Sequence, residues 1–311
     1  MPVIATLTLN PALDVSTSTE RVRSEHKLRC TAARYHPGGG GVNVARVVCT
    51  LGGNAVAVYT AGGPVGDSLQ KLLNAAGIPQ RVVPIEGQTR VSFTVDERAT
   101  HNQFRFVFPG PHVSPQEQER FYEAVATLHP RPQFLVASGS LPPGVPADFY
   151  ARFARLAKEW NAKFFLDTSG DALREVGRAG VYLVKPNLRE LSEFVGRELK
   201  TREDQIAAGR EMIRDGRAEV VVLSLGANGA LFITADEAEH FPALEVPIRS
   251  TVGAGDSMLG GIVFALARGE TLRNAVRYGM ASGAAALMAE GTELSSREDT
   301  ERLYRLVPNG D

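Results

Sequence analysis

The chain has 311 residues, 43% of them hydrophobic, and a formal net charge of −1 at pH 7. This length suits one large α/β domain or two ordinary ones, and the near-neutral charge argues against binding nucleic acid or a membrane surface through bulk charge. Cys30 and Cys49 lack CxxC spacing and the six histidines form no HxxxH pair, so we expect neither a disulfide framework nor a zinc site.

The amino-terminal segment carries neither the basic region nor the long apolar core of a signal peptide. Every stretch long enough to span a membrane contains charges. We therefore expect a cytoplasmic protein.

Short apolar runs alternate with helical segments over most of the chain. Strands are predicted at residues 3–9, 55–60, 134–138, 164–167, 181–184 and 220–224. Helices are predicted at 68–76, 115–128, 147–161 and 202–214, and near 255–268, 272–289 and 297–306. Ser114 and Glu117 occupy the positions of a capping box at the start of one of them. The alternation predicts an α/β fold with a mostly parallel sheet and helices on both faces.

Two regions break this pattern. Val91–Val95 and Phe104–Phe108 alternate with a period of two around the polar turn 97–102, which predicts a hairpin with one apolar face. Residues 15–35 also look extended, for example over Lys27–Thr31. We expect a single domain, 1–311, with a small sheet lid formed by about 15–35 and 88–108. Because a small sheet cannot easily bury a face alone, the lid should close over a ligand, pack on another subunit, or both.

Four glycines, Gly38 to Gly41, lead into a predicted helix that contains Asn43. The segment fits neither the P-loop pattern nor the dinucleotide pattern GxGxxG. It is either a tight connection to a buried helix or a backbone surface for a polar ligand, with Asn43 as a hydrogen-bonding group. The entropic cost of four glycines favours the ligand.

A second glycine-rich segment, Thr251–Asp256, precedes a mostly apolar helix. Asp256 would lie in the first turn, among backbone N–H groups that have no intrahelical partner. It is either a helix cap or a base beside an anion hole. This segment taken alone favours the cap.

Several polar or glycine-rich loops follow predicted strands. Asp14 lies just beyond the first strand, and the segments 138–144, 185–190 and 224–229 follow later ones. Ligands of open α/β sheets bind at this edge, so the loops together predict a site there, although each could be a simple connection. The basic residues of the lid, Lys27, Arg90 and Arg105, would form a phosphate clamp if they converge, whereas each alone would be solvated.

Six segments in chain order resemble those of the ribokinase-like PfkB carbohydrate kinases. They are Asn10–Asp14, Gly38–Asn43, Ser138–Gly144, Asn187–Glu190, Ser224–Gly226 and Thr251–Asp256. Within the family, the chain most closely resembles the bacterial minor-type 6-phosphofructokinases, with stretches such as Lys27–Thr31 and Ser250–Met258. The resemblance implies a ribokinase-like fold and transfer of the γ-phosphoryl group of ATP to a hydroxyl of a sugar phosphate.

The resemblance also implies residue roles. Asp256 would be the base, and the backbone N–H groups of Gly253, Ala254 and Gly255 would form the anion hole. The sugar would contact Asp14, Gly39, Asn43 and Ser140, and its phosphate would contact Lys27, Arg90 and Arg105. The nucleotide would contact Lys185, Asn187, Ser224, Gly226 and Gly229, with the adenine near Met280 and Ala284.

Two cation sites and a dimer are implied in the same way. Asn187 and Glu190 match the family's NxxE pair, which organises Mg²⁺ largely through water. A monovalent cation, K⁺, would bind main-chain oxygens of Ser250, Val252, Ala286, Ala289 and Gly291, where Ala289 replaces an asparagine common in relatives. Lids of the family often pair between subunits, so a homodimer through the lid is expected.

The substrate is inferred from Gly40 and Arg105. Many relatives that phosphorylate fructose 1-phosphate or tagatose 6-phosphate carry lysine at the position of Gly40. A glycine there, together with Arg105, favours fructose 6-phosphate as substrate and fructose 1,6-bisphosphate as product. The alternatives are a tagatose-6-phosphate kinase, a 1-phosphofructokinase, and a non-catalytic sugar-phosphate sensor, which should have lost its base or anion hole.

Overall fold

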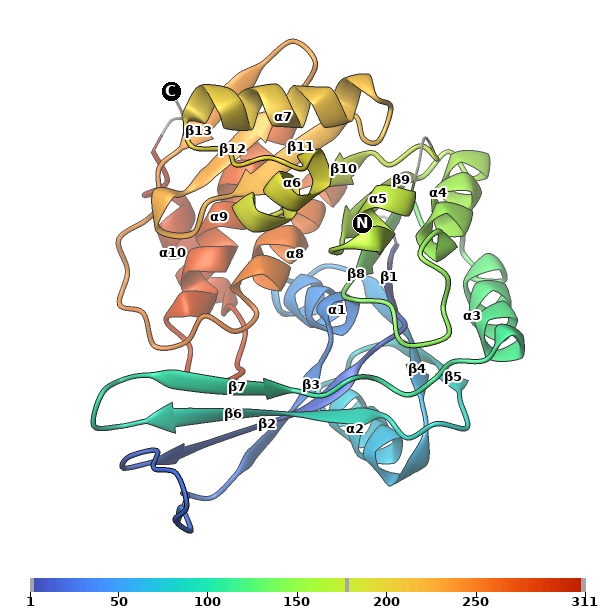
Figure 1. Ribbon diagram of the computed structural model, residues 1–311. Coiled ribbons are helices and arrows are strands. Elements are labelled where there is room, and N and C mark those ends of the chain that lie inside the picture. Colours follow the sequence, from blue (N-terminus) through green and yellow to red (C-terminus); the bar gives the residue numbers. More distant parts are fainter. Residues whose placement is uncertain (1–2, 177–178, 309–311) are drawn as a thin grey trace.

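The computed structural model describes residues 3–308 except 177 and 178. Its main sheet has nine strands in the order β13-β12-β11-β10-β9-β8-β1-β4-β5 (Figure 1). The strands are β1 (Ile4–Thr8), β4 (Ala55–Ala61), β5 (Gln80–Pro84), β8 (Phe134–Ser138), β9 (Lys163–Asp167), β10 (Leu183–Val184), β11 (Val220–Ser224), β12 (Ala230–Ile233) and β13 (Ala238–Phe241). Only β12 runs antiparallel to its neighbours, which confirms the predicted mostly parallel sheet.

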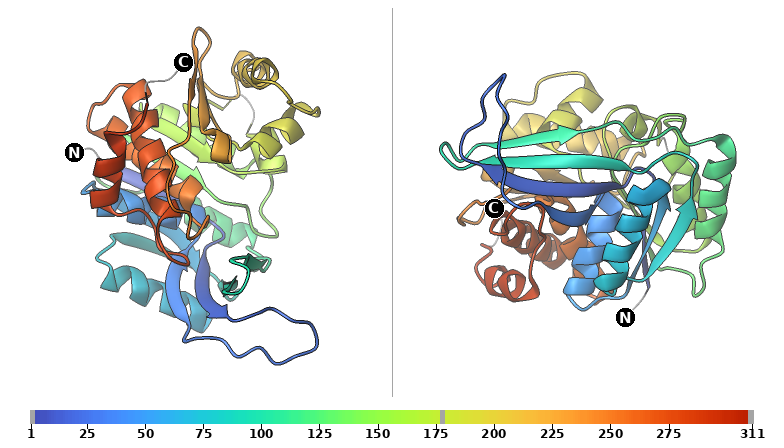
Figure 2. Two further views of the ribbon diagram at one scale, coloured as in Figure 1. Left: turned by 90° about the vertical axis from the view of Figure 1, so that its left-hand side faces the viewer. Right: turned by 90° about the horizontal axis from the view of Figure 1, so that it is seen from below.

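Helices cover both faces of this sheet (Figures 1 and 2). One core contains side chains of α1 (Gly40–Thr50), α2 (Gly63–Ala75), α8 (Ala254–Ala267) and α9 (Leu272–Leu287), against which α10 (Arg297–Tyr304) packs. The opposite core contains side chains of α3 (Pro115–Ala126), α4 (Phe149–Glu159), α5 (Asp171–Glu175), α6 (Leu188–Val195) and α7 (Arg202–Arg214). Neighbouring residues of β11 show why the strands are apolar throughout, since Val220 and Val222 enter one core and Val221 and Leu223 the other.

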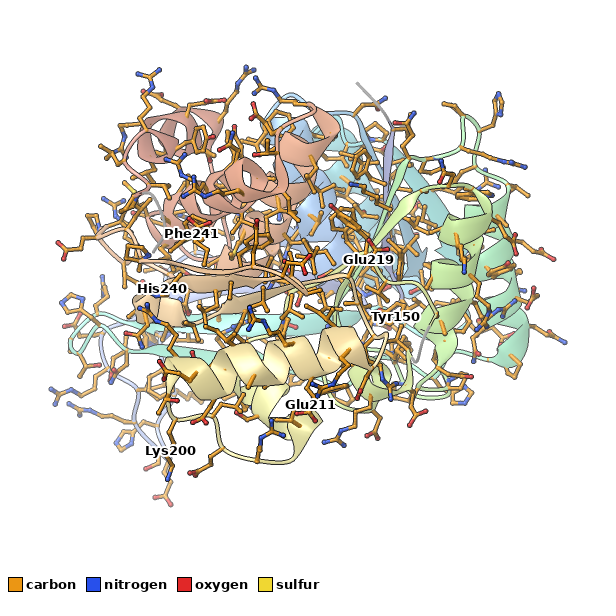
Figure 3. The ribbon with its side chains drawn as sticks, turned by 90° about the horizontal axis from the view of Figure 1, so that it is seen from above. Tyr150, Lys200, Glu211, Glu219, His240 and Phe241 are labelled. Carbon is orange, nitrogen blue, oxygen red and sulfur yellow. The ribbon has the colours of Figure 1, made fainter. Side chains whose placement is uncertain are left out.

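The edge formed by β12 and β13 was not predicted from the sequence. Phe241 on β13 is fully buried, whereas the ring of His240 lies at the surface and contacts the carbonyl of Asn228 in the 3₁₀ turn Gly226–Asn228. Figure 3 shows this edge from above, with α7, which carries Glu211, running across the sheet near it. Both strands have only four residues, too few for a clear period of two.

The predicted element boundaries hold for most segments, with a few differences. The helix α2 begins at Gly63 rather than 68, because Pro64 is accepted in a first helical turn. The strand expected over 181–184 is reduced to Leu183–Val184. Ser114 and Glu117 form the capping box expected at the start of α3. The helices α5 and α6 and the strand β5 were not predicted.

The lid is a separate four-stranded sheet in the order β3-β2-β6-β7, and it lies below the main sheet in Figure 1. Its strands are β2 (Ala12–Thr19), β3 (Arg34–Gly38), β6 (Arg90–Glu97) and β7 (Gln103–Val107). The predicted hairpin is confirmed as the antiparallel pair β6 and β7. The prediction that Lys27–Thr31 belongs to the sheet is wrong. Residues 20–33 leave the sheet as a loop without strand structure, held near its end by the N–H of Thr31 on the carbonyl of Ser18 at 2.9 Å (Figure 2).

The two faces of the lid differ in chemistry. One row of paired residues across all four strands is apolar: Tyr35, Val15, Phe93 and Phe106. The adjacent row, which points to the other face, is polar: Arg34, Ser16, Thr94 and Arg105. Thr94 and Arg105 border a cavity beside the main domain, so the polar face is directed toward that cavity.

Candidate active site

A cavity of about 170 Å³ lies between the lid and the carboxyl edge of the main sheet. Its lining comes from distant parts of the chain. It includes Asp14, Gly39, Asn43, Arg90, Arg105, Gly253 and Asp256, together with Ser92 and Thr94 of the lid. The structure therefore brings together most of the residues that the sequence predicted for sugar binding and catalysis, at the edge where ligands of open sheets bind.

Asp256 lies in the first turn of α8, after Gly253, which has the left-handed φ of 74°. Its Oδ2 accepts a hydrogen bond of 2.9 Å from Nδ2 of Asn43, and its Oδ1 accepts one of 3.4 Å from the hydroxyl of Ser138. Burial, reinforced by the nearby carboxylate of Asp167, raises the pKa of Asp256 to about 6. The side chain of Asp256 is thus hydrogen-bonded across the site rather than capping its own helix, which excludes the cap. Its role as the base stays a prediction.

The glycine-rich segment before α1 packs tightly against Asp14 and Ser138. A Cβ atom on Gly38 would lie 2.2 Å from Oδ2 of Asp14, and one on Gly40 would lie 2.2 Å from Oγ of Ser138. Burial raises the pKa of Asp14 to about 6, although Arg90 and Arg105 oppose the rise. The glycines thus allow the carboxylates of Asp14 and Asp256 to border one cavity.

The four remaining residues predicted for sugar binding differ in whether they border the cavity. The guanidinium of Arg90 donates to the carbonyls of Phe108 and Asn10 at 3.1 and 3.0 Å, so it also ties the lid to the main domain. Arg105 borders the cavity. Ser140 accepts a hydrogen bond of 3.2 Å from Asn10 and Lys27 is exposed on the lid loop, and neither belongs to the lining of this cavity. Within the described residues of one chain, the predicted three-residue clamp therefore reduces to Arg90 and Arg105.

The predicted nucleotide side contains a buried ion pair. Nζ of Lys185 lies 3.2 Å from Oδ2 of Asp167, at the ends of neighbouring strands β10 and β9. Burial alone would lower the pKa of Lys185, but the carboxylates of Asp167, Asp256 and Glu190 together outweigh burial and the pKa is raised. The hypothetical Cβ of Gly255 would be 3.3 Å from this ammonium group, so the pair borders the start of α8.

The other predicted nucleotide residues lie along the same edge or on α9. Ser224 pairs with Asn187 as an isolated parallel bridge. Gly226 and Gly229 flank the 3₁₀ turn with positive φ, and a Cβ on Gly229 would meet the carbonyl oxygen of Phe241 at 2.0 Å. Met280 and Ala284 are nearly buried on α9.

Asn187 and Glu190 form a capping box at the start of α6. The side chain of each accepts a hydrogen bond of 2.9 Å from the backbone N–H of the other. Burial and the neighbouring carboxylate of Asp167 raise the pKa of Glu190. Carboxylate and amide oxygens at this position fit a hard cation that keeps its waters, so the residues present suit Mg²⁺.

The segments predicted to hold a monovalent cation lie side by side. The hydroxyl of Ser250 donates to the carbonyl of Gly291 at 2.6 Å, and the N–H of Arg249 donates to the carbonyl of Leu287 at 2.8 Å. Their main-chain oxygens are hard donors, as K⁺ requires. Residues Val252, Ala286 and Ala289 belong to the same two segments, and their role in cation binding stays a prediction.

The sequence analysis missed Ser138 as a partner of Asp256 and Asp167 as the partner of Lys185. Both end a strand at the carboxyl edge, and this position was the signal that could have identified them. It also missed Ser92 and Thr94, whose alternation along β6 with Phe93 places them on the polar face of the lid.

The described part of the chain offers neither a clustered metal site nor a membrane-spanning helix. Between residues 3 and 308, outside 177–178, no group of three or more His, Cys, Asp or Glu side chains is arranged to hold a metal ion directly. Over the same residues, none of the helices combines the length and the apolar character needed to cross a membrane.

Comparison with known proteins gives consistent matches over most of the chain. The family model for the pfkB family carbohydrate kinases matches residues 7–299. The ATP-dependent 6-phosphofructokinase isozyme 2 of Mycobacterium tuberculosis is 48% identical over 98% of this chain and 90% of its own. The 1-phosphofructokinase of Escherichia coli is 36% identical over 94% of each chain.

A solved structure has the same fold. The crystal structure of phosphofructokinase-2 from Escherichia coli in complex with fructose-6-phosphate superposes with a TM-score of 0.92, at 39% identity over 99% of both chains. The resemblance stated from the sequence motifs is thereby confirmed. The chain belongs to the pfkB family of carbohydrate kinases.

Proposed function

We propose that this protein is an ATP-dependent kinase that phosphorylates fructose 6-phosphate to fructose 1,6-bisphosphate. The observation that carries the proposal is the position of Asp256, a carboxylate at a helix start that borders the same cavity as Asp14 and Arg105. The similarity to 6-phosphofructokinases at 48% and 39% identity, against 36% for a 1-phosphofructokinase, supports this choice of sugar.

In the proposed reaction, Asp256 takes the proton of the sugar hydroxyl while the hydroxyl oxygen bonds to the γ-phosphorus of ATP. The bond between the γ-phosphorus and the ADP oxygen breaks, and ADP leaves. With a pKa of about 6, the carboxylate is ionised at neutral pH and a stronger base than an exposed aspartate. Phosphoryl transfer depends mainly on positioning and charge stabilisation, so one base with aligned donors suffices.

The start of α8 would stabilise charge on the transferred phosphoryl group. The N–H groups of Gly253, Ala254 and Gly255 precede the first intrahelical hydrogen bonds. Gly253 has the left-handed φ of 74°, which favours glycine at this position. Asn187 and Glu190 would hold Mg²⁺ through water, and the metal would supply neutralising charge on the phosphates.

The remaining assignments belong to the same proposal. The residues proposed to bind ATP are Lys185, Ser224, Gly226, Gly229, Met280 and Ala284. Those proposed to bind the sugar phosphate are Asp14, Gly39, Asn43, Arg90, Arg105 and Ser140. Lys27, which does not line the cavity within one chain, would reach the phosphate only from a second copy. K⁺ would bind near Ser250 and Gly291. We also propose a homodimer in which the apolar row of the lid is buried against a second copy, because Tyr35 and Phe106 are 54% and 51% exposed in one chain. A cytoplasmic location stays a prediction.

The function is tested by measuring ADP release with Mg-ATP and, in parallel, fructose 6-phosphate, tagatose 6-phosphate and fructose 1-phosphate. We expect the highest kcat/KM for fructose 6-phosphate, and its loss in Asp256→Asn. A preference for either other sugar would keep the chemistry but refute the substrate. Absence of turnover with all three would favour the sensor or a different sugar.

A further inference from the structure

Arg46 is a partly buried arginine beside the proposed base that was not singled out from the sequence. It lies on α1, one turn after Asn43. Its Nη1 donates two hydrogen bonds, one of 3.1 Å to Oδ1 of Asn43 and one of 2.8 Å to the carbonyl of Pro37, which precedes the glycine-rich segment. A continuous series of donors therefore runs from Arg46 through Asn43 to Asp256.

The direction of this series follows from the chemistry of the three groups. The amide of Asn43 can present either its oxygen or its NH₂ group to a neighbour, whereas a guanidinium is only a donor. Arg46 can therefore donate only to the amide oxygen of Asn43, and this contact turns the NH₂ group of Asn43 toward Asp256. Burial lowers the pKa of Arg46 to about 10, with Asp14 and Asp256 opposing the shift, so the donor is charged at neutral pH.

Arg46 is not part of the cavity lining, whereas both Asn43 and Asp256 are. Its hydrogen bonds therefore reach the cavity through Asn43 and through the backbone at Pro37. We propose that Arg46 is a positioning residue that orients the amide of Asn43, which in turn holds the Asp256 carboxylate toward the sugar hydroxyl. This inference rests on the proposed role of Asp256 as the base.

A double-mutant cycle separates this role from a general structural one. The variants Arg46→Met, Asn43→Ala and their combination are compared with the wild type by kcat and KM for fructose 6-phosphate and Mg-ATP. Arg46→Met should lower kcat about 10- to 100-fold, the range expected for a hydrogen bond to a charged group, with the KM for Mg-ATP unchanged. In the Asn43→Ala background, the same change should lower kcat by no more than about twofold.

Two outcomes of the cycle overturn the proposal. One is a wild-type kcat in Arg46→Met. The other is an equal loss with and without Asn43, which would mean that Arg46 acts through Pro37 or through packing. The matched control is Arg152→Met. It removes an arginine of α4 that pairs with Glu119 of α3, and it should keep the wild-type kcat.

Arg46→Lys covers the case in which Arg46→Met does not fold. Lysine keeps the positive charge but lacks the planar guanidinium group, so this variant should fold and have a lower kcat. Its loss of kcat should depend on the presence of Asn43 in the same way as that of Arg46→Met. A readout independent of turnover is the side-chain NH₂ resonance of Asn43, assigned with Asn43→Ala. We expect a slowly exchanging resonance in the wild type that is lost in Arg46→Met and restored in part by Arg46→Lys. An unchanged resonance in Arg46→Met refutes the positioning role even if the wild type proves to use another sugar.

Discussion

Asn43 on α1 donates a hydrogen bond of 2.9 Å to Asp256 on α8, across 213 positions of the chain. This contact joins the two glycine-rich segments, each of which had a purely structural interpretation when considered alone. Because the starts of both helices meet there, the groups assigned to the sugar and to the phosphoryl group face one cavity.

Removing the charge of Asp256 should lower activity and raise stability. We expect Asp256→Asn to reduce kcat by about 10²- to 10⁴-fold, the usual contribution of a general base. Since the folded-state pKa is raised from 3.8 to about 6, the ionised carboxylate costs stability above that pH. After allowance for partial exposure, the gain at pH 8 should be about 1–2 kcal/mol.

Thermal unfolding of both proteins at two pH values checks the sign. The stability gain of Asp256→Asn should shrink between about pH 8 and about pH 5, because the wild-type carboxylate becomes protonated there. A variant that is less stable than the wild type at pH 8 would contradict the raised pKa.

The pH dependence of kcat should show an acidic limb near pH 6. Burial raises the pKa of both Asp256 and Asp14 to about 6, so both carboxylates become protonated as the pH falls through this value and the base is lost. The measurement uses kcat at saturating substrate, because the phosphate of the sugar itself titrates at about pH 6. Asp14→Asn should retain the limb with a shallower slope. A profile that stays flat to about pH 5 would contradict a raised pKa of Asp256 in the substrate complex.

Gly40 should tolerate no side chain. In Gly40→Ala the new methyl group would meet the hydroxyl of Ser138 at 2.2 Å and the backbone at Ser138 and Gly139 at 2.8 and 2.9 Å. We expect a loss of about 1–3 kcal/mol of stability and a lower kcat, because Ser138 donates to Asp256.

The double variant Gly40→Ala, Ser138→Ala tests the cause. It should recover only part of the stability, because the backbone contacts remain. Denaturant unfolding provides the measurement, and full recovery would show that the hydroxyl alone requires a glycine at this position.

Phe106→Glu should separate the proposed dimer. Phe106 belongs to the apolar row on the outer face of the lid, and a carboxylate buried in an interface would lack a partner. Sedimentation velocity should show a dimer for the wild type and a monomer for the variant. Leu306→Glu, at a side chain 60% exposed near the end of α10, should remain dimeric. A monomeric wild type at all assay concentrations would refute the lid interface.

The α/β class, most helices and strands, and the hairpin could be predicted from the sequence, because these features depend on local periodicity and capping. The capping box of Ser114 and Glu117 is one example, since it needs only residues three positions apart. The motifs also determined the family, which the comparisons confirm.

Tertiary structure alone decided which side chains meet. Parallel strands that end at one edge, and a lid that folds back onto this edge, produce the contacts of the site. They explain the hydrogen bonds of Asp256 with Asn43 and Ser138 and the ion pair of Lys185 with Asp167. They also explain why Lys27 lies outside the cavity. No local pattern encodes such contacts, because hydrogen bonds and burial between residues far apart in the chain form only when the whole sheet is assembled.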